Sequence, residues 1–203
     1  MAPKSPIARG RKPIAAARAI VKWVFLLGLC HATGTAWHEV MGHGLVGVLC
    51  GGEIRRVEVL TIQFYPMPAT MGWDGRFGQC YVEGIETPKG ESLTSLGGSL
   101  STWVVSVGAI VLLWIRRWRG RPKLVLVLLG LWWLDMLTYT LPSWGIRRLV
   151  FWGRYYAEPY NAAVDLGVPG WMFQAAVVGS CALLAAALIV RLIRPRRVWG
   201  GSF

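Results

Sequence analysis

The stretch "RAIVKWVFLLGLCHATGTAWHEVMGHGLVGVLC", residues 18–50, is a long apolar segment with two histidines and a glutamate toward its end. A helix of about 20 apolar residues crosses a hydrocarbon layer about 30 Å thick, so this segment is long enough to span a membrane. Three further segments of the same kind follow at 93–115, 124–144 and 171–193. The sequence therefore predicts an all-α membrane protein with about four transmembrane helices.

The composition supports a membrane protein. Of the 203 residues, 54% are hydrophobic and 12 are tryptophans. The net charge of +12 comes from short basic blocks between the apolar segments, at 4–22, 116–123 and 191–197, none of which contains an acidic residue. A nucleic-acid-binding face would carry its charge as a continuous stripe, so no nucleic-acid partner is expected. The excess of Lys and Arg predicts that all three blocks, and with them both termini, lie in the cytoplasm.

The first apolar segment raises two alternatives. The start "MAPKSPIARGRKPIAAARAIVKW" can be read as a transit peptide or a signal peptide, but the apolar character continues to Cys50. An uncleaved first span is therefore preferred. From Lys22 to Cys50 a straight helix would measure roughly 43 Å, more than one crossing needs. The segment must tilt, bend at "TGT" (33–35), leave the bilayer, or form two helices.

Strand patterns follow the first apolar segment. The stretches "IRRVEVLTIQFYP" (54–66) and "GQCYVEGIE" (78–86) are rich in β-branched residues and are separated by Gly, Pro and Asp. They predict a small β-hairpin or sheet insertion between helices 1 and 2, at the membrane surface. Such strands can wall a site or hold an extended segment by strand addition. The four cysteines are scattered and form no CxxC pair, so they indicate no disulfide scaffold. A single disulfide between Cys50 and Cys80 stays an open alternative.

The whole chain, 1–203, is expected to form one integral membrane domain. Its predicted parts are a basic cytoplasmic tail (1–17), helix 1 with the His-Glu motif (18–50), a strand-containing loop (51–92), helix 2 (93–115), helix 3 (124–144), a loop (145–170), helix 4 (171–193) and a basic tail (194–203).

The polar residues of the first helix are spaced as His-Glu-x-x-x-His, at His38, Glu39 and His43. Zinc peptidases use His-Glu-x-x-His, in which the two histidines lie about 40° apart on an α-helix. Here the spacing of five leaves them about 140° apart, so a regular helix cannot direct both at one ion. A single-turn π-bulge absorbs the extra residue and restores the alignment. Gly42 and Gly44 would tolerate it.

The residue types suit a zinc site that hydrolyses its substrate with a metal-bound water. Two neutral imidazoles hold Zn²⁺, and a glutamate beside the first acts as general base on the metal-bound water. Zinc lowers the pKa of that water to about 7. A glutamate at membrane depth is costly and usually has a function, which favours Glu39 as the catalytic base.

The motif and its surroundings resemble a known family. "HEVMGHGLVGVLCGGEIRRVEV" is similar to the site-2 protease family of intramembrane zinc metalloproteases, in particular its short bacterial branch, and "LTSLGGSLSTWV" resembles the family's small-residue segment, with Gly97 and Gly98 in the matching place. The order of helix, strands and Gly-rich helix is shared over most of the chain. The lengthened motif departs from the family pattern, although dipeptidyl peptidase III, a separate soluble family, binds zinc with the same spacing.

A third zinc ligand is needed, because hydrolytic zinc sites have three protein ligands and one open position. His31 lies about 10 Å along the helix from His38, too far to share the ion. Glu158 and Asp135 are the main candidates, and Asp165 is a weaker one. The "LD" at Asp135 resembles the Leu-Asp-Gly of the family, and "EPYNAAVDLGVP" resembles another of its patterns. Counting helical rise from Lys22 and Lys123 puts Asp135 deeper in the membrane than the histidines, which favours Glu158.

Two functions are compatible with the sequence. The preferred one is an intramembrane zinc metalloprotease that cleaves membrane or juxtamembrane segments of a membrane protein or peptide. The alternative is a catalytically silent relative that serves as a scaffold or subunit of a membrane complex. An unbroken α-helix through 36–50, with the two imidazoles on different faces, would favour the scaffold. The resemblance implies a multi-pass protein of the bacterial inner membrane, surrounded by lipid.

Overall fold

The computed structural model describes residues 11–72, 76–148 and 155–193. Four helical segments in this part of the chain are long and apolar enough to cross a membrane: Ala16–Leu49, Pro88–Ile115, Gly120–Trp144 and Gly170–Ile193. The predicted fold class, a helical membrane protein with four spans and a small sheet between the first two, is confirmed. The predicted basic tail 194–203 and the first ten residues of the other tail lie outside the described residues.

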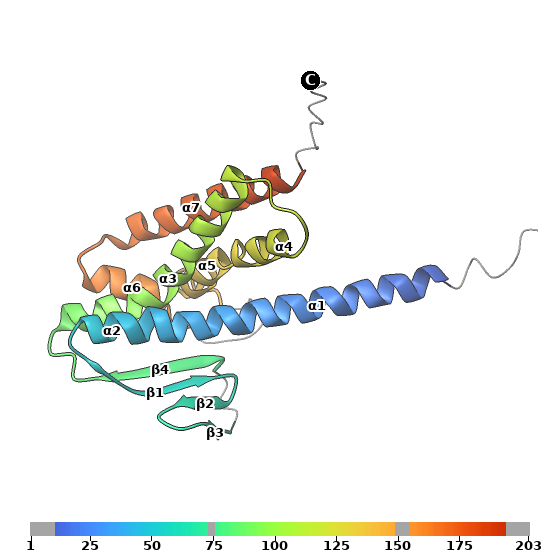
Figure 1. Cartoon of the computed structure of the whole chain (residues 1–203). Coiled ribbons are helices and arrows are strands. Elements are labelled where there is room, and N and C mark those ends of the chain that lie inside the picture. Colours follow the sequence, from blue (N-terminus) through green and yellow to red (C-terminus); the bar gives the residue numbers. More distant parts are fainter. Residues whose placement is uncertain (1–10, 73–75, 149–154, 194–203) are drawn as a thin grey trace, which may run out of the picture.

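The first span is one continuous helical rod. Its parts are α1 (Arg11–Trp37), the π-helical segment η2 (His38–Gly44) and α2 (Leu45–Leu49). Of the alternatives for its extra length, a bend at 33–35 is not observed, because α1 runs as one unbroken helix through these residues. The amino-terminal half of α1 extends well beyond the rest of the bundle (Figure 1). The extra length is therefore accommodated by projection rather than by a bend at 33–35.

The sheet insertion has four antiparallel strands in the order β3-β2-β1-β4. The strands are β1 (Glu53–Val59), β2 (Ile62–Tyr65), β3 (Ala69–Thr70) and β4 (Gly78–Glu83). Alternation along β1 buries Val57 and Val59. The sheet packs along the η2 and α2 end of the first span, with β1 and β4 nearest to the helix (Figure 1). The sheet therefore forms one wall beside η2.

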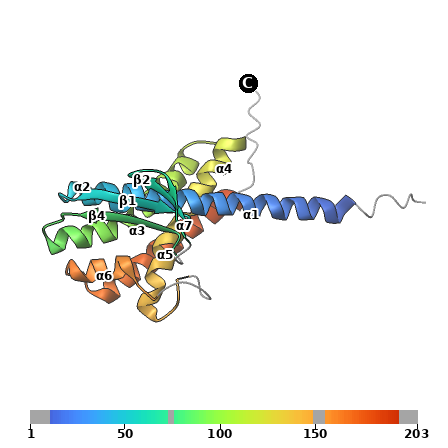
Figure 2. The same cartoon turned by 90° about the horizontal axis from the view of Figure 1, so that it is seen from below.

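The second span, α3 (Pro88–Ile115), begins five residues before the predicted boundary because Thr87 caps it, accepting a hydrogen bond from the Gly90 amide at 3.1 Å. It contacts η2 on one side and α6 (Glu158–Asp165) on another, so it forms the centre of the bundle (Figures 1 and 2). Helix α6 lies in the segment 145–170, for which the sequence predicted a loop; Pro159 in its first turn is compatible with a helix start. Residues 149–154 of that loop lie outside the described part.

The third span is interrupted. It consists of α4 (Gly120–Leu129), a turn at 130–132, α5 (Trp133–Thr140) and the 3₁₀ segment η3 (Leu141–Trp144). The fourth span, α7 (Gly170–Ile193), packs against both parts. Two apolar clusters join them. In the first, Leu126 and Val127 of α4 pack against Ile110 and Leu113 of α3 and Leu188 of α7, and the second consists of Met136, Val177 and Cys181. The turn lets α5 approach the first span at the level of η2.

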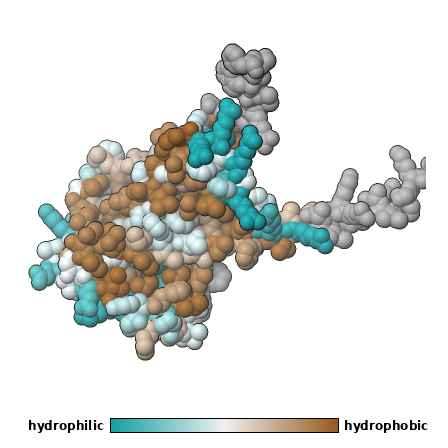
Figure 3. Space-filling view, in the orientation of Figure 1, coloured by the Kyte–Doolittle hydropathy of each residue, from teal (hydrophilic) through white to brown (hydrophobic). Residues whose placement is uncertain are grey.

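Apolar side chains cover much of the face in Figure 3. Many large apolar residues are exposed, for example Leu183 and Ile193, each 72% exposed, and Phe25 at 67%. In a water-soluble protein such extensive apolar exposure would be unfavourable, whereas in a bilayer these side chains face lipid. The four spans and this surface make the chain an integral membrane protein.

Candidate metal centre

The π-helical segment η2 brings the two histidines of the motif together. The extra residue between them is absorbed by the wider turn, as the spacing predicts, and the Nε2 atoms of His38 and His43 lie 3.0 Å apart. Both rings are buried, with 1% and 8% of the residue exposed. Ligand atoms of His38, Glu39 and His43 all lie within 4.8 Å of one another. The unbroken α-helix with diverging imidazoles that would favour the scaffold alternative is therefore not observed.

The outer nitrogen of each imidazole has a partner that determines its tautomer. His43 Nδ1 lies 2.7 Å from the Thr94 carbonyl oxygen, which can only accept, so Nδ1 carries the hydrogen. His38 Nδ1 lies 2.8 Å from Asp135 Oδ2 and donates to it in the same way. In the neutral rings each Nε2 therefore presents a lone pair, and the two lone pairs face each other.

At this distance two facing lone pairs repel each other unless a metal ion, or a proton shared in a hydrogen bond, lies between them. A zinc ion with Zn–N bonds of about 2.0–2.1 Å and tetrahedral angles holds two ring nitrogens about 3.3 Å apart, close to the separation here. The donor set and the tautomers thus fit a metal ion bound by His38 and His43. Outer partners such as Asp135 and the Thr94 carbonyl are the kind that orient metal-binding histidines.

Space for an ion is provided by Gly98 on α3. A Cβ built on this glycine would lie 2.6 Å from His43 Nε2 and would also clash with His38 Nε2. The absent side chain of Gly98 therefore leaves open the volume against both ring nitrogens. The neighbouring Gly97 lets α3 approach η2 closely, since its Cβ would lie 2.7 Å from the Gly42 carbonyl oxygen.

The three carboxylates weighed as a third ligand lie in different positions. Glu158 Oε1, at the start of α6, lies 3.6 Å from His43 Nε2, on the side of the ring that faces the other histidine. Asp135 Oδ2 contacts the opposite nitrogen of His38 and also accepts from the Thr102 hydroxyl at 2.8 Å. Asp165 is exposed and does not line the cavity described below.

The depth comparison made from the sequence is wrong for Asp135, which directly contacts His38. That comparison counted helical rise from Lys22 and Lys123 as if both residues marked the same level. The amino-terminal half of α1 projects past the bundle, so helical rise counted from this half and from α4 does not start at one level (Figure 1). The depth of the histidines and the depth of Asp135 were therefore measured from different levels.

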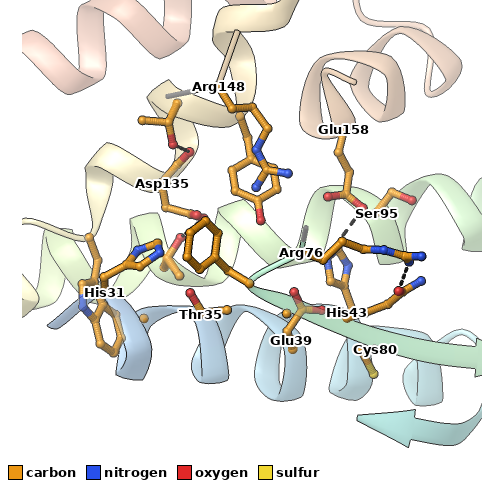
Figure 4. A pocket seen from close by; sticks show the side chains of 18 of the residues that line it. His31, Thr35, Glu39, His43, Arg76, Cys80, Ser95, Asp135, Arg148 and Glu158 are labelled. Atoms are coloured by element: carbon orange, nitrogen blue, oxygen red, sulfur yellow. Dashed lines mark hydrogen bonds and ion pairs between the residues drawn. The ribbon is translucent and has the colours of Figure 1, made fainter. Parts of the chain in front are cut away.

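Glu39 lies one residue after His38 and is 3% exposed. It packs against Gly78 of β4, where an added Cβ would lie 2.7 Å from Glu39 Oε1. The strand backbone thus runs close to this carboxylate because Gly78 has no side chain. In Figure 4, Glu39 and His43 from the first span and Asp135, Arg148 and Glu158 from the opposite wall surround one cavity.

The cavity has a volume of about 670 Å³ and is lined by the first span, β4, α3, α5 and α6. His31 and Thr35 continue the row of Glu39 along α1 at intervals of four residues (Figure 4). The His31 ring packs edge-on against Phe77, with centroids 5.0 Å apart, and His31 is not part of the clustered ligand group.

Cys80 of β4 also lines the cavity. Burial raises the pKa of its thiol to about 12, and the Glu39 carboxylate adds to the shift. The thiol is therefore protonated at neutral pH. All four cysteines are free, so the Cys50 to Cys80 disulfide considered from the sequence is not formed.

Several residues of the site were not found from the sequence. Thr94 and Thr102 lie four residues before and after Gly98, which the sequence did single out, and all three share one face of α3, toward η2 and α5. The spacing of four is visible in the sequence, but the sequence does not show that this face of α3 lies opposite the His-Glu motif. Tyr139 packs on His38, with ring centroids 4.8 Å apart, and Arg148 lies over Tyr139. No sequence pattern pointed to this stack.

Residues 13–154 match the family described as Peptidase M50B-like, which covers the first three spans, the sheet and the His-Glu motif. No curated protein and no solved structure matches the chain. The matched segment is more than half of the chain and includes the paired histidines and Gly98. The chain therefore belongs to the Peptidase M50B-like family, a branch of the site-2 proteases, whose members are intramembrane metalloproteases.

Proposed function

We propose that this protein is an intramembrane zinc metalloprotease that hydrolyses peptide bonds in membrane or juxtamembrane segments. The observation that carries the proposal is the pair of buried imidazoles with their Nε2 atoms 3.0 Å apart, next to Glu39, in a membrane-spanning helix. In the proposed site His38, His43 and Glu158 hold the ion. Asp135 orients His38 and is not itself a ligand.

Zinc, when bound, would acidify a water molecule and polarise the carbonyl group of the scissile bond. The Glu39 carboxylate accepts the proton of the attacking water. It then holds this proton and donates it to the nitrogen of the leaving amine, which balances the hydrolysis. Burial among Gly78, the histidines and the cavity wall keeps bulk water from competing for the carboxylate.

The direct test is metal analysis combined with cleavage by the full chain purified in detergent. We expect stoichiometric zinc, cleavage of a reporter that carries an apolar segment, loss of cleavage when a chelator removes the metal, and recovery when zinc is returned. Full zinc occupancy without cleavage of any apolar reporter would favour the scaffold alternative. Absence of zinc from protein purified and assayed with zinc supplied would count against the whole site.

The ligand assignment predicts different effects for the two carboxylates. Glu158→Gln removes a proposed ligand, whereas Asp135→Asn removes the acceptor that fixes the His38 tautomer. Loss of an outer partner lowers metal affinity about 10–100-fold. We expect Asp135→Asn to fall within this range and Glu158→Gln to lower zinc affinity further, as measured by competition with a chromophoric chelator. The reverse order would make Asp135 the ligand and Glu158 the accessory group.

The substrate is proposed to lie extended along β4. This strand forms one edge of the sheet, and Gly78, Gln79, Cys80 and Val82 line the cavity. An edge strand offers backbone groups for strand addition. In an extended substrate every second backbone amide would face β4. A peptide that is N-methylated at these amides should have a higher KM, whereas N-methylation of the other amides should leave KM unchanged. Equal kinetics for both peptides would show that the backbone is not bound in this way.

We also propose that both termini face the cytoplasm of a bacterial cell. The four spans alternate in direction, so the amino-terminal part of α1, the turn between α3 and α4 and the carboxy-terminal end of α7 lie toward the same end of the bundle (Figure 1). Basic residues favour the cytoplasmic side. A carboxy-terminal alkaline phosphatase fusion should be inactive, and the same fusion after residue 86 should be active, because that enzyme matures only outside the cytoplasm.

A further inference from the structure

A second charged feature lies far from the cavity, at the turn between α3 and α4. We call the residues Arg116, Arg117, Arg119, Arg121 and Lys123 the basic turn. Its four arginines are exposed, and the chain contains no acidic residue from 92 to 134 or from 166 to 203. Among the described residues, the ion pairs all lie elsewhere, at the metal centre and on the sheet. The described part of the protein does not itself neutralise this charge.

The basic turn is held in place by Trp118. The indole Nε1 donates to the Leu112 carbonyl at 2.8 Å, and the ring packs against the cluster of Ile110, Leu113 and Leu188. The Arg116 guanidinium lies over the same ring, 5.0 Å from its centroid. Because the backbone of the turn is anchored in the core, its cations are gathered before any ligand arrives, which lowers the entropy cost of binding.

Arg191 ties the end of α7 to this turn. Its Nε donates to the Leu113 carbonyl at 2.6 Å, and its Nη2 lies 3.5 Å from the Arg116 carbonyl. These contacts satisfy carbonyl groups that the end of α3 leaves without helical partners. Arg191 therefore has a structural task, but its charge adds to the field of the basic turn.

Apolar side chains lie directly next to these cations. Trp114 and Ile115 at the end of α3 are 41% and 76% exposed, and Leu192 and Ile193 at the end of α7 are 44% and 72% exposed. Figure 3 shows hydrophilic side chains beside apolar ones at this end of the bundle. A phosphate group alone would use only the cations. A ligand with a phosphate and hydrocarbon chains would use both surfaces.

We propose that the basic turn is a binding site for an anionic phospholipid. The phosphate is held by Arg117, Arg119 and Arg121, whose planar guanidinium groups can bind phosphate through paired hydrogen bonds. The acyl chains lie along Ile115 and Ile193. This site is independent of the protease proposal, because none of its residues lines the cavity.

The test uses the full chain in phosphatidylcholine nanodiscs that contain a minor fraction of spin-labelled lipid. The quantity measured is the preference for spin-labelled phosphatidylglycerol over spin-labelled phosphatidylcholine in the immobilised shell. We expect a clear preference for phosphatidylglycerol in the wild type, with each lost arginine lowering affinity about fivefold. The variant R117Q/R119Q/R121Q should therefore lose most of the preference.

Two further variants separate the site from general charge and from folding. R55Q/R56Q/K89Q removes the same number of positive charges around the sheet, where Arg55 and Arg56 are paired with glutamates, and should keep the preference. R117K/R119K/R121K keeps the charge and should retain most of it. Equal lipid selectivity in the wild type and the glutamine variant would overturn the proposal, as would displacement of the lipid by inorganic phosphate alone.

Discussion

Replacement of Glu39 by glutamine should lower kcat for peptide hydrolysis by about a hundredfold to ten-thousandfold, the contribution usual for a general base. Glutamine keeps the shape of the side chain, so it fits beside Gly78, but it cannot accept the proton of the attacking water. Glu39 is not one of the proposed ligands, so zinc content should not change. The two measurements are initial rates with an apolar reporter and zinc per chain after gel filtration.

Glu91→Gln is a suitable control for that variant. Glu91 lines the same cavity, and its replacement makes the same chemical change without touching the histidine pair. We expect its kcat to stay within a few fold of the wild type. A Glu39→Gln variant that cleaves at the wild-type rate would remove Glu39 from the mechanism. A variant that loses zinc together with activity would instead give Glu39 a role in holding the metal.

Gly98→Ala is expected to weaken zinc binding strongly. The new Cβ would lie 2.6 Å from His43 Nε2 and would also crowd His38 Nε2, within the volume that an ion shared by the two nitrogens needs. We expect zinc affinity to fall by at least about a hundredfold, the upper end for loss of one outer partner, because the obstruction acts on both ligands at once. Competition with a chromophoric chelator measures the change.

Gly108→Ala provides the matched control on the same helix. A Cβ at Gly108 meets no atom within 4 Å, so the substitution should leave zinc affinity unchanged. The helix content and thermal unfolding of both variants show whether α3 still packs. If Gly98→Ala binds zinc as tightly as Gly108→Ala in a folded protein, the ion does not lie against both Nε2 atoms.

The sequence was sufficient for the membrane class and the strand insertion, because both depend on local patterns. Long apolar runs specify spans, and alternation with β-branched residues specifies strands. Boundaries were less accurate where capping decided them, as at Thr87, and the short helix Glu158–Asp165 was missed in a segment with several turn-forming residues. The interruption of the third span at 130–132 was also not predicted.

The His-Glu-x-x-x-His spacing by itself determined that a π-helical turn was required if His38 and His43 were to meet, because the angle per residue of an α-helix is constant. Only the tertiary structure decided what surrounds them. Asp135 and the Thr94 carbonyl come from distant segments and set the tautomers, and Gly98 leaves the open volume. Asp135 lies at Nδ1 of His38 and Glu158 lies near Nε2 of His43, and both positions depend on how α5 and α6 pack against the first span. Such contacts arise from the packing of whole helices, which no local pattern encodes.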